Sequence, residues 1–309
     1  MPTDSTSRRA RPRPPLDLAA LLPSWELAMR AERKSRETIK GYGDGVRGFL
    51  RWCDANGHRP ALERDLVKGF VADLLDNGAE PSTARARQLG VRRFSAWLTE
   101  EGEFDADPLL GLKAPKLDTK VTPSLTDDEL RRLFKACVGK DFRDRRDEAI
   151  VRLMAETGMR AGEVCGLSVS DVDLQRGLVT VHRGKGGKGR IAPFGDQTGL
   201  AIDRYLRMRR THRLADTDAL WLGDRGKGLN YHGLHRALKG RAELARLTNF
   251  HPHLLRHTAA SRWLAAGGSE GGLMAVAGWS TRDMIDRYTR STAAERAADE
   301  ARTLGLGDL

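Results

Sequence analysis

The chain has 309 residues, of which 39% are hydrophobic and 31% charged, a balance typical of globular proteins and a length sufficient for two domains. Its formal net charge of +11 favours a polyanionic partner, above all nucleic acid, because lysine and arginine displace counterions from phosphates. The absence of any apolar run of about eighteen residues argues against a membrane span, and the three scattered cysteines argue against zinc or a disulfide framework and indicate a reducing, cytoplasmic compartment.

Residues 1–15 are rich in arginine and proline and no long apolar core follows them, so we expect a disordered basic tail and no secretory signal. Residues 16–112 have the pattern of a helical domain. Within it, apolar residues from Ile39 to Cys53 form a helical stripe, although each glycine in this stretch costs about 1 kcal/mol in a helix. This helix must therefore be held by tertiary contacts, or it is interrupted.

Two further helices are predicted in the same domain, one over residues 64–75 and one that begins after Pro81 with Ser82 as its N-cap. The last of these is expected to bury four large apolar side chains, Leu89, Phe94, Trp97 and Leu98. Three polar side chains are spaced to share another face, Arg85, Gln88 and Arg92. The net charge favours contact of this face with DNA phosphates over simple solvation.

A linker is predicted at residues 113–124, where proline and lysine are frequent and periodicity is weak. The remaining residues, 125–309, have the pattern of one larger and mainly helical domain. The alternating, β-branched segments 178–182 and 190–194 flank a glycine-rich turn and predict a small hairpin with a lysine-bearing tip. The expected fold class is therefore mainly α with a small β-hairpin or sheet.

Two segments of the larger domain place cationic side chains where an anion could bind. TGMRAGEVCGL (157–167) predicts a helix end at Gly158 and a new helix near Arg160, beside backbone N–H groups that attract anions. The hairpin tip, RGKGGKG, holds Lys185 and Lys188 between glycines, as a proton donor to a DNA oxygen would require. Taken alone, an arginine or lysine in such a segment is more often a solvated side chain on the protein surface.

Two further segments complete an ordered set. HPHLLRH predicts a helix on which His253 and Arg256 share a face. His253 and His257 have a spacing seen in metal sites, but the glutamate and the third ligand of such a site are missing, so contact with phosphate or a satisfied core histidine is favoured. GWSTRDMIDRYTR (278–290) places Tyr288 between two arginines on a predicted helix. Packing explains such a tyrosine by itself, but not its place at the end of this series.

Taken in order, the four segments make the chain resemble the tyrosine recombinases of the phage integrase family. TGMRAGEVCGL is similar to the first arginine box of that family, HRGKGGKGRIAPF to its β-hairpin lysine box, HPHLLRHTAASRWLAAG to its HxxR box and AGWSTRDMIDRYTR to its nucleophile box. The resemblance implies a helical, SAM-like core-binding domain at residues 16–112 and an α+β catalytic domain at residues 125–309 with a C-terminal helix. The arm-binding domain of many phage integrases is not expected.

By resemblance, six residues form the catalytic set, Arg160, Lys185, His253, Arg256, Trp279 and Tyr288. The two arginines are expected to clamp the scissile phosphate, because their planar guanidinium groups are always charged and bind phosphate in a bidentate manner. The tyrosine is expected to attack the phosphorus and form a 3′-phosphotyrosine.

The remaining residues have expected roles around this attack. His253 is the expected base, and Lys185 is expected to protonate the departing 5′ oxygen, with Lys188 as the alternative. Glu163 is expected to orient the arginine or the histidine. Trp279 stands where many relatives have histidine, and its indole can donate a hydrogen bond but cannot act as acid or base.

The resemblance also implies partners and leaves rivals. We expect double-stranded DNA with a specific core site, a homotetramer in the synaptic complex with or without an accessory DNA-bending protein, and location at the nucleoid. No metal or other cofactor is expected, because the arginines and a lysine supply the electrostatic stabilisation. The expected role is integration or excision of a phage or mobile element, with chromosome-dimer resolution as the alternative; a type IB topoisomerase and a non-catalytic DNA-binding relative remain as rivals.

Overall fold

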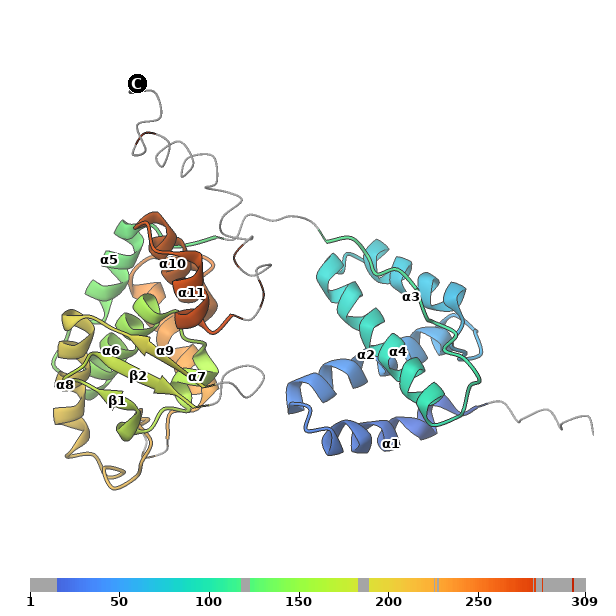
Figure 1. Ribbon diagram of the computed structural model, residues 1–309, viewed down its shortest axis with the longest axis horizontal. Helices are drawn as coiled ribbons and strands as arrows, with labels where there is room; N and C mark the ends of the chain where they lie inside the picture. Colours follow the sequence, from blue (N-terminus) through green and yellow to red (C-terminus); the bar gives the residue numbers. More distant parts are fainter. Residues whose placement is uncertain are drawn as a thin grey trace, which may run out of the picture. The chain divides into compact units, whose positions relative to one another are not determined.

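The computed structural model describes residues 16–117, 123–182, 189–224, 226, 228–279, 281, 285 and 302. The chain divides into two compact units at residues 119 and 120, which lie inside the predicted linker (Figure 1). Each unit has its own cluster of buried apolar side chains. In the described part of the chain, no helix combines the length and apolar character needed to cross a membrane.

The first unit is helical throughout its described secondary structure, with α1 (Leu18–Ala31), α2 (Arg36–Ala55), α3 (Arg64–Asp76) and α4 (Pro81–Glu100). The side-chain oxygens of Asp17 and Ser35 accept backbone hydrogen bonds at the starts of α1 and α2, as N-cap residues do. Aromatic side chains fill the core, where the rings of Trp25 and Phe94 lie 5.1 Å apart. The helices predicted near residues 39–53 and 64–75 are confirmed.

The close crossing of α2 and α4 explains the glycines of α2, which is an uninterrupted helix. A Cβ added to Gly45 would lie 2.6 Å from the carbonyl oxygen of Arg87, and one added to Gly90 would lie 2.6 Å from that of Tyr42. Any side chain at these two positions would push the backbones apart, so the packing offsets the low helix propensity of glycine. Of the two alternatives, tertiary contact holds this helix.

The start of α4 differs from the predicted one. Glu80 occupies the N-cap position and Pro81 the first turn, so Ser82 lies inside the helix and its prediction as N-cap is wrong. Proline is well accommodated at the first helical position, because the N–H group that it lacks would have no intrahelical partner there.

The buried face of α4 also differs from the predicted one. Gln88 is only 2% exposed, whereas Leu89 is 36% exposed. The Nε2 atom of Gln88 donates to the carbonyl oxygen of Lys113 at 3.2 Å, so this side chain holds the segment that follows α4. Because the glycine crossing sets the rotation of α4, Gln88 turns inward and does not join Arg85, which is exposed, and Arg92, which is half-buried, on one surface.

The described part of the second unit is mainly helical, with α5 (Asp127–Ala136), α6 (Phe142–Thr157), α7 (Ala161–Cys165), α8 (Asp196–Arg209), α9 (Tyr231–Leu244), α10 (Pro252–Ala265) and α11 (Glu270–Ala277). A short 3-10 helix, η1 (Val169–Asp171), precedes a sheet of β1 (Val172–Asp173), β2 (Leu178–Val181) and β3 (Arg190–Pro193). Both strand pairs are antiparallel, and Val181 pairs with Arg190 at the hairpin tip. The predicted hairpin and the predicted fold class are confirmed.

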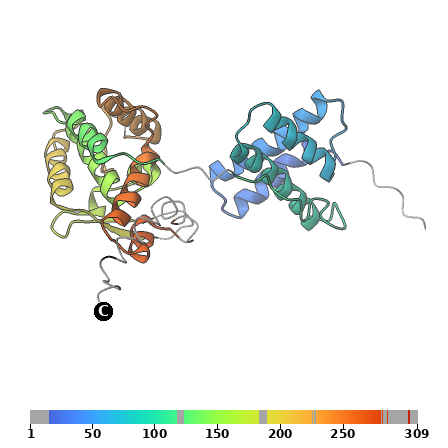
Figure 2. The ribbon, with the colours of Figure 1, turned by 90° about the horizontal axis from the view of Figure 1, so that it is seen from above.

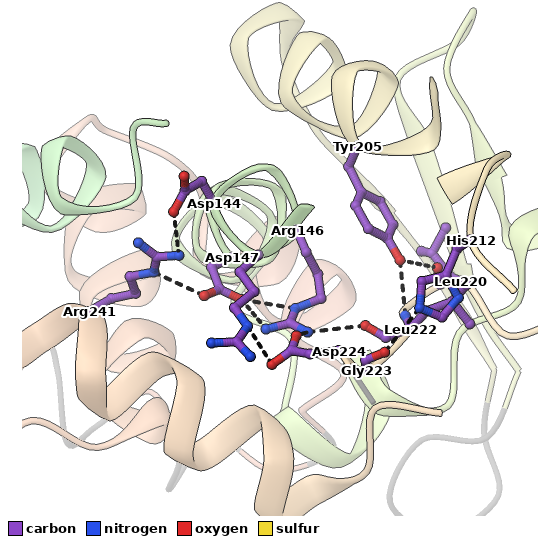
Figure 3. A network of polar contacts seen from close by, with 11 residues as sticks. Asp144, Arg146, Asp147, Tyr205, His212, Leu220, Leu222, Gly223, Asp224 and Arg241 are labelled. Atoms are coloured by element: carbon purple, nitrogen blue, oxygen red, sulfur yellow. Dashed lines mark hydrogen bonds and ion pairs between the residues drawn. The ribbon is translucent and has the colours of Figure 1, made fainter. Parts of the chain in front are cut away.

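α6 runs through the middle of the second unit (Figures 1 and 2), and charged side chains on it are buried in ion pairs. Arg146 donates to Asp147 at 2.9 Å and to Asp224 at 2.6 Å, and Arg241 of α9 donates to Asp144 and Asp147 (Figure 3). Buried charges persist only when they are paired and hydrogen-bonded. The network therefore fixes α9 and the segment around Asp224 against α6.

Candidate active site

The end of α6 places the first predicted arginine. Gly158 ends the helix in the left-handed conformation, with φ of 62°, which favours glycine because a side chain is strained there. Arg160 follows as the N-cap residue of α7. The helix end at Gly158 and the helix start near Arg160, both expected from the sequence, are confirmed.

Glu163 holds Arg160 by two hydrogen bonds. Its carboxylate accepts from the backbone N–H of Arg160 at 2.9 Å and from Nη1 of the Arg160 side chain at 2.8 Å. Burial of this carboxyl group raises its pKa, but the hydrogen bonds from Arg190 and from the Arg160 backbone more than offset that effect and hold the pKa below its usual value. The carboxylate is therefore ionised at neutral pH and orients the arginine.

The second partner of Glu163 is Arg190, a residue for which the sequence predicted no role beyond the strand. Its Nη1 and Nη2 atoms donate to the two oxygens of Glu163 at 3.1 and 2.7 Å, and its Nε donates to the carbonyl oxygen of Val276 at 2.8 Å. The alternation of side chains along the strand could have indicated such a role. Arg190 lies on the same inner face of β3 as the buried Ala192, whereas Ile191 between them is exposed. An arginine inside and an isoleucine outside reverse the usual pattern.

Arg256 lies in α10 and is only 1% exposed. Its Nη1 donates to the carbonyl oxygen of Gly158 at 2.6 Å, and its Nη2 donates to that of Ala277 at 2.8 Å. These two bonds set the plane of the guanidinium group against the end of α6 and the end of α11. The two arginines predicted to bind phosphate are thus anchored around the same α6–α7 turn.

Trp279 packs against Arg256 and is buried. The Arg256 guanidinium carbon lies 5.1 Å from the centroid of the Trp279 ring, within the range of a cation–π interaction. The backbone N–H of Trp279 donates to the carbonyl oxygen of Met274, which continues the end of α11. In this structure the ring supports the arginine from one side.

His253 lies in the first turn of α10 and is exposed, in contrast to Arg256. Its ring centroid lies 4.6 Å from that of His257, with the two rings at 83° to each other. Among the described residues no group of three or more histidine, cysteine, aspartate or glutamate side chains could hold a metal ion. Within that described part of the chain, His253 and His257 therefore belong to no group with the three ligands that a metal site needs.

Three predicted site residues lie outside the described residues, Lys185, Lys188 and Tyr288. The structure describes residues that are close to them in the sequence. Val181 and Arg190 pair where β2 ends and β3 begins, on either side of residues 183–188 in the sequence. Ile285, three positions before Tyr288, is buried in an apolar cluster with Trp279, Leu264 and Leu273.

A sequence profile of the Phage integrase family matches residues 123–295, which include every one of the four boxes. The chain belongs to the phage integrase family. It is 34% identical over 240 residues to the tyrosine recombinase XerC of Pseudomonas fluorescens, a match that covers 76% of this chain and 79% of that protein. The predicted enzyme class, a tyrosine recombinase, is confirmed.

Solved structures agree with this assignment. The crystal structure of XerA recombinase is similar with a TM-score of 0.53 and 27% identity, covering 92% of this chain and 99% of that one. A lambda integrase tetramer bound to a Holliday junction is similar with a TM-score of 0.65 and 16% identity, covering 85% of this chain and 77% of that one. The second likeness concerns the fold alone.

Proposed function

We propose that this site-specific DNA recombinase cleaves and rejoins double-stranded DNA through a covalent 3′-phosphotyrosine at Tyr288. The observation that supports the proposal is the anchoring of Arg160 and Arg256 around one turn. Arg256 bonds the carbonyl oxygen of Gly158, and Arg160 begins the next helix two residues later. Two guanidinium groups held in this way suit the two non-bridging oxygens of one phosphate.

The proposed reaction conserves the energy of the phosphodiester. The Tyr288 hydroxyl loses its proton to His253, its oxygen bonds to phosphorus, and the bond between phosphorus and the 5′ oxygen breaks. Lys185, or Lys188 in its place, protonates the departing 5′ oxygen. The 5′ hydroxyl of a second strand then attacks the phosphotyrosine and releases Tyr288, so no nucleotide or other cofactor is consumed.

We propose a homotetramer on two DNA duplexes as the active assembly, since the lambda integrase with the same fold forms a tetramer on a Holliday junction. Integration or excision of a phage or mobile element is the proposed role. Chromosome-dimer resolution is the second candidate role. It is supported by the similarity to the tyrosine recombinase XerC, which covers 76% of this chain and therefore extends beyond the catalytic boxes. An accessory DNA-bending protein is compatible with either role.

Adduct capture tests the chemistry. Purified protein is mixed with sheared genomic DNA from its source cell, denatured in SDS, and the DNA that remains covalently bound is sequenced. Adducts at one or a few sequences are expected for the wild type, and none for Tyr288→Phe, while DNA binding of the two proteins stays within about twofold because only one hydroxyl is removed. Adducts in Tyr288→Phe would exclude this nucleophile, and adducts spread over all sequences would favour a topoisomerase.

The DNA sequence found by adduct capture then serves as the substrate in a test of the proton donor. A DNA substrate with sulfur in place of the 5′ bridging oxygen has a leaving group that needs no proton. Lys185→Ala is expected to cleave the ordinary substrate slowly and to recover on the sulfur substrate, whereas Lys188→Ala is expected to cleave both at similar rates. The reverse result would assign the proton to Lys188.

A further inference from the structure

We propose that Arg190 is a positioning residue of the recombinase: it shares Glu163 with Arg160, leaves Arg160 free to bind phosphate, and ties the β-hairpin to the end of α11. The inference rests on the proposed function. Arg190 is the first residue of β3, next to the hairpin tip. Neither the sequence boxes nor the resemblance assigned it a role.

The first argument is the balance of charge around Glu163. The side chains of Arg190 and Glu163 are 8% and 6% exposed, so their interaction is little screened by water. Arg190 occupies both carboxylate oxygens, while the Arg160 side chain uses only its Nη1 atom, on Oε1. Without Arg190, the buried carboxylate would have Arg160 as its only cationic partner in these contacts. It would then draw that guanidinium away from the DNA and neutralise it.

The second argument is the contact of Arg190 with α11. Its Nε donates to the carbonyl oxygen of Val276, and the next carbonyl, of Ala277, accepts from Arg256. The last carbonyls of a helix have no intrahelical partner and carry a partial negative charge, so two guanidinium groups stabilise this end. Arg190 and Arg256 therefore hold adjacent residues of the same helix end, from which the chain continues to Trp279.

Gly278 makes this approach possible. It has φ of 65°, and a Cβ added to it would lie 3.0 Å from Cδ and 3.1 Å from Nη1 of Arg190. The chain thus leaves α11 directly over the Arg190 side chain. One side chain consequently connects the strand next to the lysines, the arginine of α7 and the segment that leads toward Tyr288.

A purely structural role makes a different prediction from a positioning role. If Arg190 only anchors β3, then the rate of the double variant should follow its melting temperature, because removal of the buried carboxylate acts on the rate only through stability. If Arg190 restrains the carboxylate, then the charge of Glu163 causes the defect in Arg190→Gln. Removal of that charge in the double variant Glu163→Gln/Arg190→Gln then restores the rate. A double-mutant cycle separates the two cases.

The experiment measures the first-order rate of covalent attachment at saturating protein on the site found by adduct capture, together with the melting temperature. The proteins are wild type, Arg190→Gln, Glu163→Gln and the double variant. Arg207→Gln, which removes an arginine from an exposed ion pair with Asp203 on α8, is the matched control. Arg190→Gln should be slower on the order of 100-fold, since a small misplacement of a phosphate-binding group has that effect. The double variant should recover at least about tenfold of this loss, and Arg207→Gln should match wild type.

Failure of the inference is distinguishable from failure of the proposed function. A double variant as slow as Arg190→Gln or slower, with adducts formed normally by wild type, overturns the role of Arg190 alone. Wild type that forms no adduct on any DNA overturns the proposed function and this inference with it. If Arg190→Gln does not fold, Arg190→Lys replaces it. The lysine keeps the positive charge but cannot bond Glu163 and Val276 at the same time, so its rate should lie between those of wild type and Arg190→Gln. Adding Glu163→Gln should raise that rate as well.

Discussion

Trp279 and Arg256 show how one residue can set the chemistry of its neighbour. The buried indole lies against the guanidinium group, while the carbonyl oxygens of Gly158 and Ala277 hold that group at its edge. Contacts on a face and on an edge leave little rotational freedom to the arginine. A fixed arginine binds a phosphate without a further loss of side-chain entropy.

Trp279→Ala should therefore lower both stability and rate. Loss of a large buried ring is expected to cost about 3 kcal/mol of unfolding free energy, and attachment to DNA should slow at least about tenfold because Arg256 loses its support. Calorimetry and the adduct rate measure the two effects. Trp263→Ala is the control, since Trp263 packs against the same apolar cluster but lies seven residues after Arg256, near the end of α10. Equal losses of rate in both variants would contradict the prediction.

Glu163 makes stability depend on pH. Its pKa in the folded protein is held below its usual value, chiefly by Arg190 acting against burial, so it contributes stability above the unfolded pKa of about 4.3. This contribution is lost as pH falls through the folded pKa. The difference in unfolding free energy between wild type and Glu163→Gln should be present at pH 7 and shrink below pH of about 4. Glu243→Gln, at an exposed position of α9, should show little difference at either pH.

At the scale of elements, short contacts between backbones decide which helices can pair. α2 and α4 approach so closely at Gly45 and Gly90 that neither position has space for a methyl group. The contact between α6 and α9 is of the opposite kind, because long charged side chains join the two helices. Arg241 of α9 donates hydrogen bonds to Asp144 and Asp147 of α6. The first pairing depends on the absence of side chains and the second on the matching of their charges.

Two glycine variants of α2 should change stability in opposite directions. Gly45→Ala places its Cβ 2.6 Å from a backbone oxygen that cannot move away easily, so a loss of about 2–3 kcal/mol is expected. Gly41→Ala meets no atom within 4 Å, so it should gain up to about 1 kcal/mol from helix propensity alone. Chemical denaturation measures both. A stabilising Gly45→Ala would show that α2 and α4 can move apart at this crossing without a loss of stability.

At the scale of the whole molecule, the two units have separate apolar cores. Trp25, Phe49 and Phe94 belong to the cluster of the first unit, and Leu153 and Trp221 to that of the second. A contiguous core is what makes a segment fold cooperatively. Each unit therefore has the physical requirement for folding by itself.

The fragments 16–117 and 123–309 should each fold alone. Each is expected to give one cooperative thermal transition, and the full chain should show both. Gly45→Ala should lower only the transition of the first unit, and Trp279→Ala only that of the second. Differential scanning calorimetry resolves the transitions, and a single transition that both variants shift together would contradict the prediction.

Local patterns along the chain were sufficient for several helices, for the hairpin and for the family. The helix end at Gly158, the hairpin strands on either side of the lysines and the helix that carries Arg256 all follow from residues close in sequence. Such features depend on backbone preference and on the period of apolar residues, both of which a single segment displays. The order of the four boxes then identified a tyrosine recombinase.

Those local patterns could not predict contacts between residues that are far apart in the sequence. Arg190 and Glu163 are 27 positions apart, Arg256 and the Gly158 carbonyl 98, and Gln88 and the Lys113 carbonyl 25. A polar side chain has the same letter whether it faces DNA or a buried carbonyl, so Gln88 appeared to belong to a surface and Arg190 to an ordinary strand. The packing of α4 on α2, and of β3 against α7 and α11, chose between these environments, because a buried charge or amide must find its partner inside the fold.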